Sequence, residues 1–130
     1  MTQNDQTTTL AKLKKTVGRF ITERQWDQFH SPKNLSMSIA IEAAELMEKF
    51  QWVPEKESRS LYAKGRGRTE LEHEVADIAI FLLSISNALR IDLARAVKAK
   101  LRHNAEKYPV DLVKGKHHKY TYYQQNKTRR

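Results

Sequence analysis

The sequence has 130 residues, a net charge of +9 at pH 7 and no cysteine. This length predicts one domain with one hydrophobic core, and the lack of cysteine excludes disulfides and thiolate metal sites. No apolar run approaches the roughly 20 residues that span a bilayer, and the polar first residues lack the pattern of a secretion signal. We therefore expect a soluble, cytoplasmic protein.

The positive charge is concentrated at the end of the chain. No acid follows Asp111, whereas the cations that follow it are Lys114, Lys116, Lys119, Lys127, Arg129 and Arg130. This composition predicts a basic, flexible tail over residues 114–130, after a domain over residues 1–113.

Two helices are predicted on either side of a short aromatic connection. The apolar residues of the first recur at helical spacing and are Leu10, Leu13, Val17, Phe20 and Ile21. They predict a helix over about residues 9–23. Ser31 followed by Pro32 is typical of a helix start, so a second helix is expected from there to about Trp52, before Pro54.

Two further helices follow a charged loop. Thr69 and Glu72 have the spacing of a capping box, which predicts a third helix over about residues 70–90. Asp92 is expected to cap a fourth helix over about residues 93–106, with Pro109 beyond its end.

Two short motifs place carboxylates three residues apart, Glu42 with Glu45 and Glu74 with Asp77. Positions i and i+3 are neighbours on a helix surface. At about 100° per residue, Glu42 and Glu74 fall on stripes that are otherwise apolar. Because a buried unpaired carboxylate is very costly, such acids must be neutralised, paired or bound to a metal.

Four clustered carboxylates suit a hard cation, so the sequence predicts a site for Mg²⁺, with Mn²⁺ as a substitute. An alternative stays open, in which one or both pairs lie at a rim and form ion pairs with Lys or Arg.

Four helices with an acidic interior indicate an all-α, four-helix-bundle-like fold. One small bundle cannot easily close over a cluster of negative charge and a ligand. We therefore expect an oligomer, a homodimer or a homotetramer, whose subunits build the site together.

Four segments in this order resemble the MazG-like all-α nucleoside triphosphate pyrophosphohydrolases, closest to their dCTP pyrophosphatase branch. They are Trp-Asp-Gln-Phe-His-Ser-Pro-Lys-Asn-Leu at 26–35, Glu-Ala-Ala-Glu-Leu-Met-Glu-Lys-Phe-Gln-Trp at 42–52, Glu-Val-Ala-Asp-Ile at 74–78 and Asn-Ala-Glu-Lys-Tyr-Pro at 104–109. The resemblance covers about residues 20–109. Either acidic motif alone would be weak evidence, but the ordered set is specific.

The resemblance implies a MazG-type fold and hydrolysis of a nucleoside triphosphate to the monophosphate and pyrophosphate, with Mg²⁺ required. It favours dCTP or a modified dCTP as substrate, in a nucleotide-pool housekeeping role. The positions that match the family's metal ligands are Glu42, Glu45, Glu74 and Asp77. One of the first pair, Glu45 ahead of Glu42, would orient or deprotonate the attacking water.

The resemblance also assigns substrate contacts near the first two helices. Trp26 and Trp52 match positions of the base pocket, where an indole can stack on a pyrimidine, although core packing is the commoner fate of tryptophan. His30 could hydrogen-bond base or phosphate, or be structural. Where dCTP-type relatives carry a tyrosine, this chain has Phe81, so one polar contact to the base is lost while the metal chemistry is unaffected.

In the fourth helix, Lys100 and Asn104 match positions that face the phosphates in relatives. Alternatively, Lys100 and Asn104 lie on a solvated basic face of this helix, together with Arg95, Lys98 and Arg102. Tyr108 would close the site or simply pack.

Two other classes compete with this interpretation. A ferritin-like di-metal bundle needs Glu-x-x-His on two helices, and only Glu70 with His73 is a fair candidate. A basic nucleic-acid-binding helical module without catalytic activity would use the cations of residues 64–68 and the tail, where Tyr120, Tyr122 and Tyr123 lie among the cations. Such tails are more often solvated or packed on a neighbouring subunit, so we do not expect nucleic acid as a partner.

Overall fold

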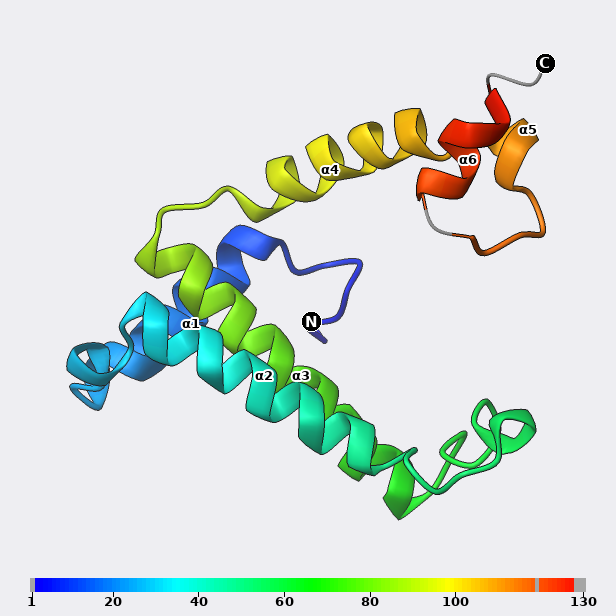
Figure 1. Cartoon of the computed structure of the whole chain (residues 1–130). Helices are drawn as coiled ribbons and strands as arrows, with labels where there is room; N and C mark the ends of the chain where they lie inside the picture. The colour runs from blue at the N-terminus through cyan, green and yellow to red at the C-terminus, as the bar shows by residue number, and fades with distance from the viewer. Residues whose placement is uncertain (1, 119, 128–130) are drawn as a thin grey trace. The chain divides into compact units, whose positions relative to one another are not determined.

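The computed structural model describes residues 2–118 and 120–127 (Figure 1). Within these residues every regular element is a helix, which confirms the all-α class. The α-helices are α1 (Leu10–Glu23), α2 (Pro32–Glu48), α3 (Arg66–Ala88), α4 (Leu93–Lys107), α5 (Val110–Val113) and α6 (Tyr120–Lys127), and the short 3₁₀ turns are η1 (Asp27–Phe29) and η2 (Glu55–Glu57). No helix of the described residues is long and apolar enough to cross a bilayer. The chain divides into two compact units, Met1–Ile91 and Asp92–Arg130.

Helix α1 begins where the sequence predicts, because Thr9 caps it. The Thr9 Oγ1 accepts a hydrogen bond from the Lys12 amide at 3.2 Å. After Glu23 the chain turns through Gln25, whose φ of +55° is left-handed and ends the helix.

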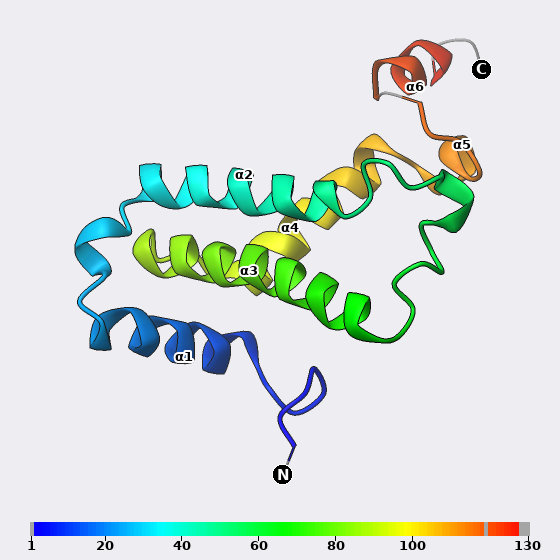
Figure 2. The same ribbon diagram turned by 90° about the horizontal axis from the view of Figure 1, so that it is seen from below.

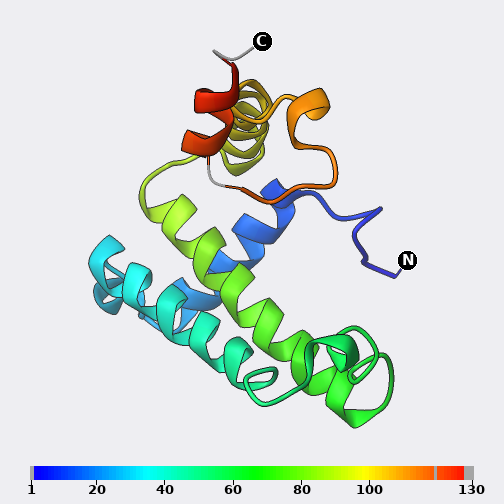
Figure 3. The same cartoon turned by 45° about the vertical axis from the view of Figure 1, so that its right-hand side comes forward.

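Helix α2 starts as predicted and ends earlier than predicted. The Ser31 Oγ accepts from the Asn34 amide at 3.2 Å, and Pro32 occupies the first turn. We expected the helix to continue to about Trp52, but it ends at Glu48. The Tyr62 hydroxyl donates to the Lys49 carbonyl at 2.7 Å, which satisfies an acceptor that a longer helix would have used. The turns that follow, residues 49–65, lie at one end of the α2–α3 pair (Figure 3).

Helix α3 begins four residues before the predicted start. Gly65, with a φ of +84°, precedes the first turn, and Thr69 lies inside the helix. The predicted capping box is therefore wrong. The Glu72 carboxylate instead accepts from the Arg68 Nε at 2.8 Å, an i,i+4 pair on the helix surface.

The first unit consists of α3 packed between α1 and α2 (Figure 2). Its buried apolar side chains come from all three helices and are Ile21, Leu35 and Leu83. Two hydrogen bonds tie α1 to the end of α3. The Asn87 Nδ2 donates to the Lys14 carbonyl at 2.9 Å, and the Lys14 Nζ donates to the Ile91 carbonyl at 2.6 Å.

Large apolar side chains remain exposed on α2 and α3. They are Met37, Ile41, Met47, Val75, Ile80 and Leu82, and we refer to them as the exposed apolar surface. Ile41 is 58% and Met47 61% exposed. Single exposed apolar residues are normal on a protein surface, whereas large contiguous patches mark interaction sites.

The second unit begins with α4, which Asp92 caps as predicted by accepting from the Arg95 amide at 3.0 Å. Residues 114–130, expected to be a flexible tail, contain α6. Tyr123 of α6 is only 4% exposed, and its ring lies 5.8 Å from that of Tyr108. This aromatic contact gives the polar stretch a small core that its composition does not reveal. Lys119, Arg129 and Arg130 lie outside the described residues, and a separate tail starting at residue 114 stays a prediction.

Candidate active site

Three carboxylates meet where α2 packs along α3. Glu42, Glu45 and Glu74 each place an oxygen atom within 4.8 Å of the other two. We refer to these residues as the acid cluster. Glu42 and Glu74 are half-buried and Glu45 is exposed. Glu42 and Glu45 are one helical turn apart on α2. Glu74 is on α3, so it joins them because α2 packs against α3.

Asp77, the fourth predicted ligand, lies one turn beyond Glu74 on α3 and is half-buried. It is not part of the group of oxygens within 4.8 Å. Its negative charge nevertheless acts on Glu42. Three of the four predicted acids are therefore gathered, and Asp77 borders them.

The electrostatics of the acid cluster are unfavourable for Glu42. Burial raises the pKa of its carboxyl above the ordinary value of 4.5, and the charge of Glu45 and a side-chain hydrogen bond with Glu45 raise it further. The charges of Asp77 and Glu74 act in the same direction. The Glu42 Oε2 is buried without a hydrogen-bond partner. This oxygen lacks the interaction that a cation or a proton would supply.

The alternative in which Lys or Arg neutralises these acids finds no support among the side chains of residues 2–118 and 120–125. The ion pairs recorded there are Lys49 with Glu70, Arg66 with Glu70, and Arg68 with Glu72. They lie toward the start of α3 and leave the acid cluster unpaired. A set of carboxylate oxygens with a buried unpartnered atom fits a hard divalent cation such as Mg²⁺.

The same ion pairs bear on the two competing classes. Glu70 is engaged by two cations and His73 is exposed, so neither joins the acid cluster as a ferritin-like motif would require. Arg66 and Arg68, two of the cations that a nucleic-acid module would use, are paired with acids of their own helix.

Three of the predicted base-binding residues form a row of rings beside the acid cluster. Trp26 lies 6.5 Å from His30 in a stacked arrangement, and His30 lies 6.3 Å from Phe81. Phe81 is one turn beyond Asp77 on α3, so the row starts next to the acids. The His30 Nδ1 is buried without a partner.

Trp52, by contrast, is 86% exposed and does not join this row. Core packing, its alternative fate, is therefore excluded in this structure. Trp26 is also partly exposed, and its indole edge contacts Phe20 at 5.9 Å between ring centroids.

Lys100, Asn104 and Tyr108 belong to the second unit. Lys100 is exposed, Asn104 is half-buried, and the Tyr108 ring packs against Tyr120 and Tyr123 at 6.1 and 5.8 Å. The roles of Lys100 and Asn104 toward the phosphates, and of Tyr108 in closing the site, stay predictions.

A cavity beyond the row of rings brings in residues that the sequence analysis did not single out: Asp27, Ser84 and Asn87. The signal that could have found Ser84 and Asn87 is their spacing of three residues, one helical turn, within a largely apolar stretch of α3 that also contains Ser86. Asp27 gave no such signal.

An all-α fold with a carboxylate cluster between two helices and a neighbouring row of rings defines the class as a helical protein with a candidate metal site. The sequence model of the MazG-like family matches residues 37–122. The dCTP pyrophosphatase 1 of Bos taurus is 39% identical over 113 residues, 87% of this chain and 67% of that protein. The dCTP pyrophosphatase 1 of Homo sapiens is 35% identical over 113 residues, which cover 87% of this chain and 66% of that protein. This chain belongs to the MazG-like family.

A solved structure agrees with the fold. A pyrophosphatase from Archaeoglobus fulgidus superposes with a TM-score of 0.72 at 35% identity, covering 84% of this chain and 98% of that one. This chain spans about two thirds of the length of the curated relatives it matches. The resemblance drawn from the sequence is confirmed at the level of the family.

Proposed function

We propose that this protein hydrolyses a deoxynucleoside triphosphate, dCTP or a modified dCTP, to the monophosphate and pyrophosphate, with Mg²⁺ as the required ion. That it is a nucleoside triphosphate pyrophosphatase is supported by its family, by two dCTP pyrophosphatases among its relatives and by a pyrophosphatase of the same fold. The observation that carries the proposal is the unpaired acid cluster.

The acid cluster explains why a metal is needed. A triphosphate carries about four negative charges near neutral pH, so carboxylates repel it unless a cation lies between. Glu42, Glu45 and Glu74 would hold this cation, with Asp77 completing the set from the next turn. When bound, Mg²⁺ would neutralise phosphate oxygens, polarise phosphorus and lower the pKa of the attacking water.

The carboxylates have different parts in this scheme. Glu45 is the exposed member, and its oxygens are accessible to a water molecule that it orients or deprotonates. Glu42 is half-buried and its Oε2 is buried without a hydrogen-bond partner, which suits a group that a bound cation would hold in place.

The row of rings supplies a surface for the base. Phe81 lies nearest the acids, one turn beyond Asp77 on α3, and His30 and then Trp26 continue the row. Stacking on such rings contributes about 1–3 kcal/mol per base and tolerates any base. Selection among bases therefore needs polar groups in addition.

Lys100 and Asn104 are proposed to face the phosphates, and Tyr108 to close the site; its alternative, packing, is supported by its contacts with Tyr120 and Tyr123. A cysteine-free sequence supports a place in the reducing cytoplasm, with a housekeeping role in the nucleotide pool.

We also propose that the active protein is a homodimer or a homotetramer. The exposed apolar surface of α2 and α3 supports this, because burying it against a second copy removes it from water. Its location on the two helices that carry the acid cluster makes the assembly relevant to the site.

The experiment is pyrophosphate release from a panel of standard and modified ribonucleoside and deoxynucleoside triphosphates, with Mg²⁺ and with a chelator. We expect release only with metal, and strongest with dCTP or a 5-substituted dCTP. A folded, metal-supplied protein that turns over no nucleotide would contradict the proposal and favour the nucleic-acid-binding alternative.

A further inference from the structure

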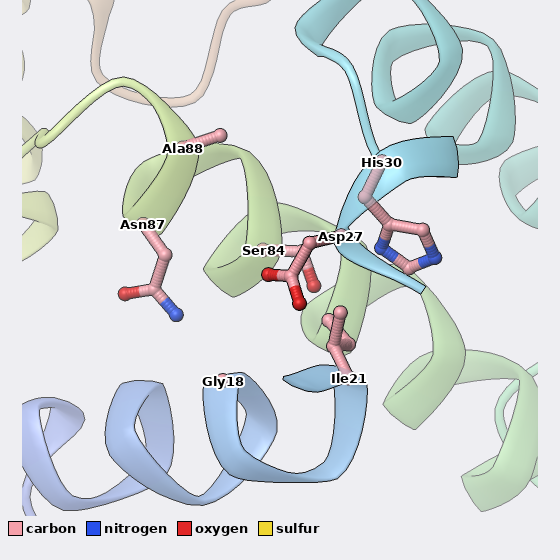
Figure 4. Close-up of a pocket in the computed structure, with 7 residues that line it drawn as sticks. All are labelled: Gly18, Ile21, Asp27, His30, Ser84, Asn87 and Ala88. Carbon is pink, nitrogen blue, oxygen red and sulfur yellow. The ribbon is translucent and has the colours of Figure 1, made fainter. Parts of the chain in front are cut away.

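A polar cavity lies between α1, the η1 turn and the end of α3 (Figure 4). Its volume is about 240 Å³, roughly that of eight water molecules at about 30 Å³ each. Besides Gly18, Ile21 and Ala88, its lining includes four polar side chains: Asp27, His30, Ser84 and Asn87. All of its lining belongs to the first unit.

The hydrogen bonds already made in the structure decide what this cavity offers to a ligand. The Ser84 hydroxyl donates to the Ile80 carbonyl at 2.8 Å, so its oxygen is left as an acceptor. Asn87 is held against α1 by its bond to the Lys14 carbonyl. The side chain of Asp27 has no hydrogen bond or ion pair recorded within the described part of the chain, and it lines the cavity together with Ser84 (Figure 4).

His30 adds a complementary group at the edge of the cavity. Its Nδ1 is buried and has no partner, so it can donate in the tautomer that carries the proton there. The cavity therefore presents acceptors, from Asp27 and Ser84, next to two donors, His30 and the amide hydrogen of Asn87 that is not given to Lys14. This pattern suits a ring with an amino group beside an unprotonated ring nitrogen.

The distance from the acid cluster also suits a nucleoside. Ser84 follows Asp77 by seven residues on α3, an axial rise of about 10.5 Å. The stretch between them is covered by the row formed by Phe81, His30 and Trp26. A nucleotide with its α-phosphate at the acids would extend its base along this row.

We propose that this cavity receives the amino-bearing edge of the base and that Asp27 is a specificity-determining residue, accepting a hydrogen bond from the exocyclic amino group. The inference rests on the proposed function, since it extends the same site. Cytosine offers an amino donor beside an acceptor nitrogen, which matches Asp27 and His30. Uracil and thymine offer a carbonyl acceptor beside an N–H donor, which mismatches both.

The test compares kcat/KM for dCTP and dUTP, with Mg²⁺, in the wild type and in Asp27→Asn. We expect the wild type to prefer dCTP and the variant to lose about tenfold or more of that preference, mainly through a higher KM for dCTP. Glu23→Gln makes the same charge change on an exposed residue of α1 outside the cavity, and should keep the wild-type ratio. Ser84→Ala, which keeps all charges, should lower the ratio by about threefold. An unchanged ratio in Asp27→Asn, or in Ser84→Ala if Asp27→Asn does not fold, would overturn the inference.

A binding measurement separates this inference from the proposed function. Saturation-transfer NMR on an equimolar mixture of deoxycytidine and deoxyuridine, with a chelator present, should show stronger transfer to deoxycytidine in the wild type and equal transfer in Asp27→Asn. This result without any nucleotide turnover would sustain the cavity assignment and remove the proposed reaction. If the wild type turns over dCTP but Asp27→Asn changes neither the kcat/KM ratio nor the saturation transfer, the proposed reaction is sustained and the cavity assignment is overturned.

Discussion

Glu42 and Glu74 come from helices that meet side by side, and their carboxylate oxygens approach within 4.8 Å although no cation of the described residues is paired with them. Such an arrangement costs folding free energy because burial and like charge both oppose ionisation. A fold that keeps it has a use for it, and a divalent cation both removes the cost and supplies the chemistry. The predictions below follow from this relationship and from its surroundings.

Glu45→Gln should abolish turnover while the helical fold survives. The amide keeps the shape of the side chain but neither binds a cation as a carboxylate does nor accepts a proton, so kcat should fall by about 10²-fold or more. Circular dichroism should be unchanged. Glu48→Gln, on the same helix and outside the acid cluster, is the control and should keep its rate. Full activity in Glu45→Gln would remove this residue from the site.

Asp77→Asn tests whether the acid bordering the cluster is a ligand. The structure leaves it outside the group of three, yet its charge reaches Glu42. We expect loss of metal-dependent pyrophosphate release, together with a slightly higher Tm of the metal-free protein because one repulsive charge is gone. Unaltered kinetics and an unaltered Mg²⁺ requirement would restrict the ligands to the acid cluster.

Mg²⁺ should stabilise the protein through the acid cluster. At a concentration of about 100 Kd a ligand adds about 2.7 kcal/mol to the free energy of unfolding, which raises Tm by about 10 °C for a chain of this size. Differential scanning fluorimetry with Mg²⁺ and with a chelator measures the shift. Glu74→Gln should lose most of it, and an equal shift in wild type and variant would place the ion elsewhere.

The metal-free protein should become more stable as pH falls from neutrality toward the ordinary carboxyl pKa. The folded-state pKa of Glu42 is raised above 4.5, so between these two values the folded chain binds more protons than the unfolded chain. Stability therefore decreases as pH rises through that window. Denaturant unfolding of wild type and Glu42→Gln at pH 5 and pH 7, with a chelator, isolates the effect. The difference in the free energy of unfolding between Glu42→Gln and the wild type should be larger at pH 7 than at pH 5. An equal difference at the two pH values would contradict the raised pKa of Glu42.

Ile41→Glu should break the assembly. Placing a charge on the exposed apolar surface of α2 opposes its burial against a second copy. Size-exclusion chromatography with light scattering should show an oligomer for the wild type and the 15.2 kDa monomer for the variant. Gln51→Glu adds the same charge outside this surface and should remain oligomeric. A wild type that elutes only as the monomer would remove the proposed assembly.

Local signals in the sequence predicted the helix starts that depend on one capping side chain. Ser31 and Asp92 both accept from an amide three residues on, as their residue types indicate. The start of α3 was missed because Glu72, which fits a capping box, pairs with Arg68 instead. Two local interactions competed for one side chain, and the sequence does not say which is stronger.

The acids of the site could be predicted because they are arranged by helix periodicity, and the resemblance fixed which of them belong together. The polar cavity could not, because it depends on how closely α1 approaches α3. Asn87 reaches the backbone of Lys14, a residue 73 positions earlier in the chain. No periodicity within one helix reveals such a contact. The exposure of Trp52 was likewise missed, since it follows from where α2 ends.

The most direct measurement is a product analysis of dCTP hydrolysis by ion-exchange chromatography, with Mg²⁺ and with a chelator, in the wild type and in Glu45→Gln. We predict equal amounts of dCMP and pyrophosphate from the wild type with Mg²⁺, and no products with the chelator or from the variant. Formation of dCDP and phosphate, or product formation that persists in the chelator, would contradict a metal-dependent pyrophosphohydrolase built on the acid cluster.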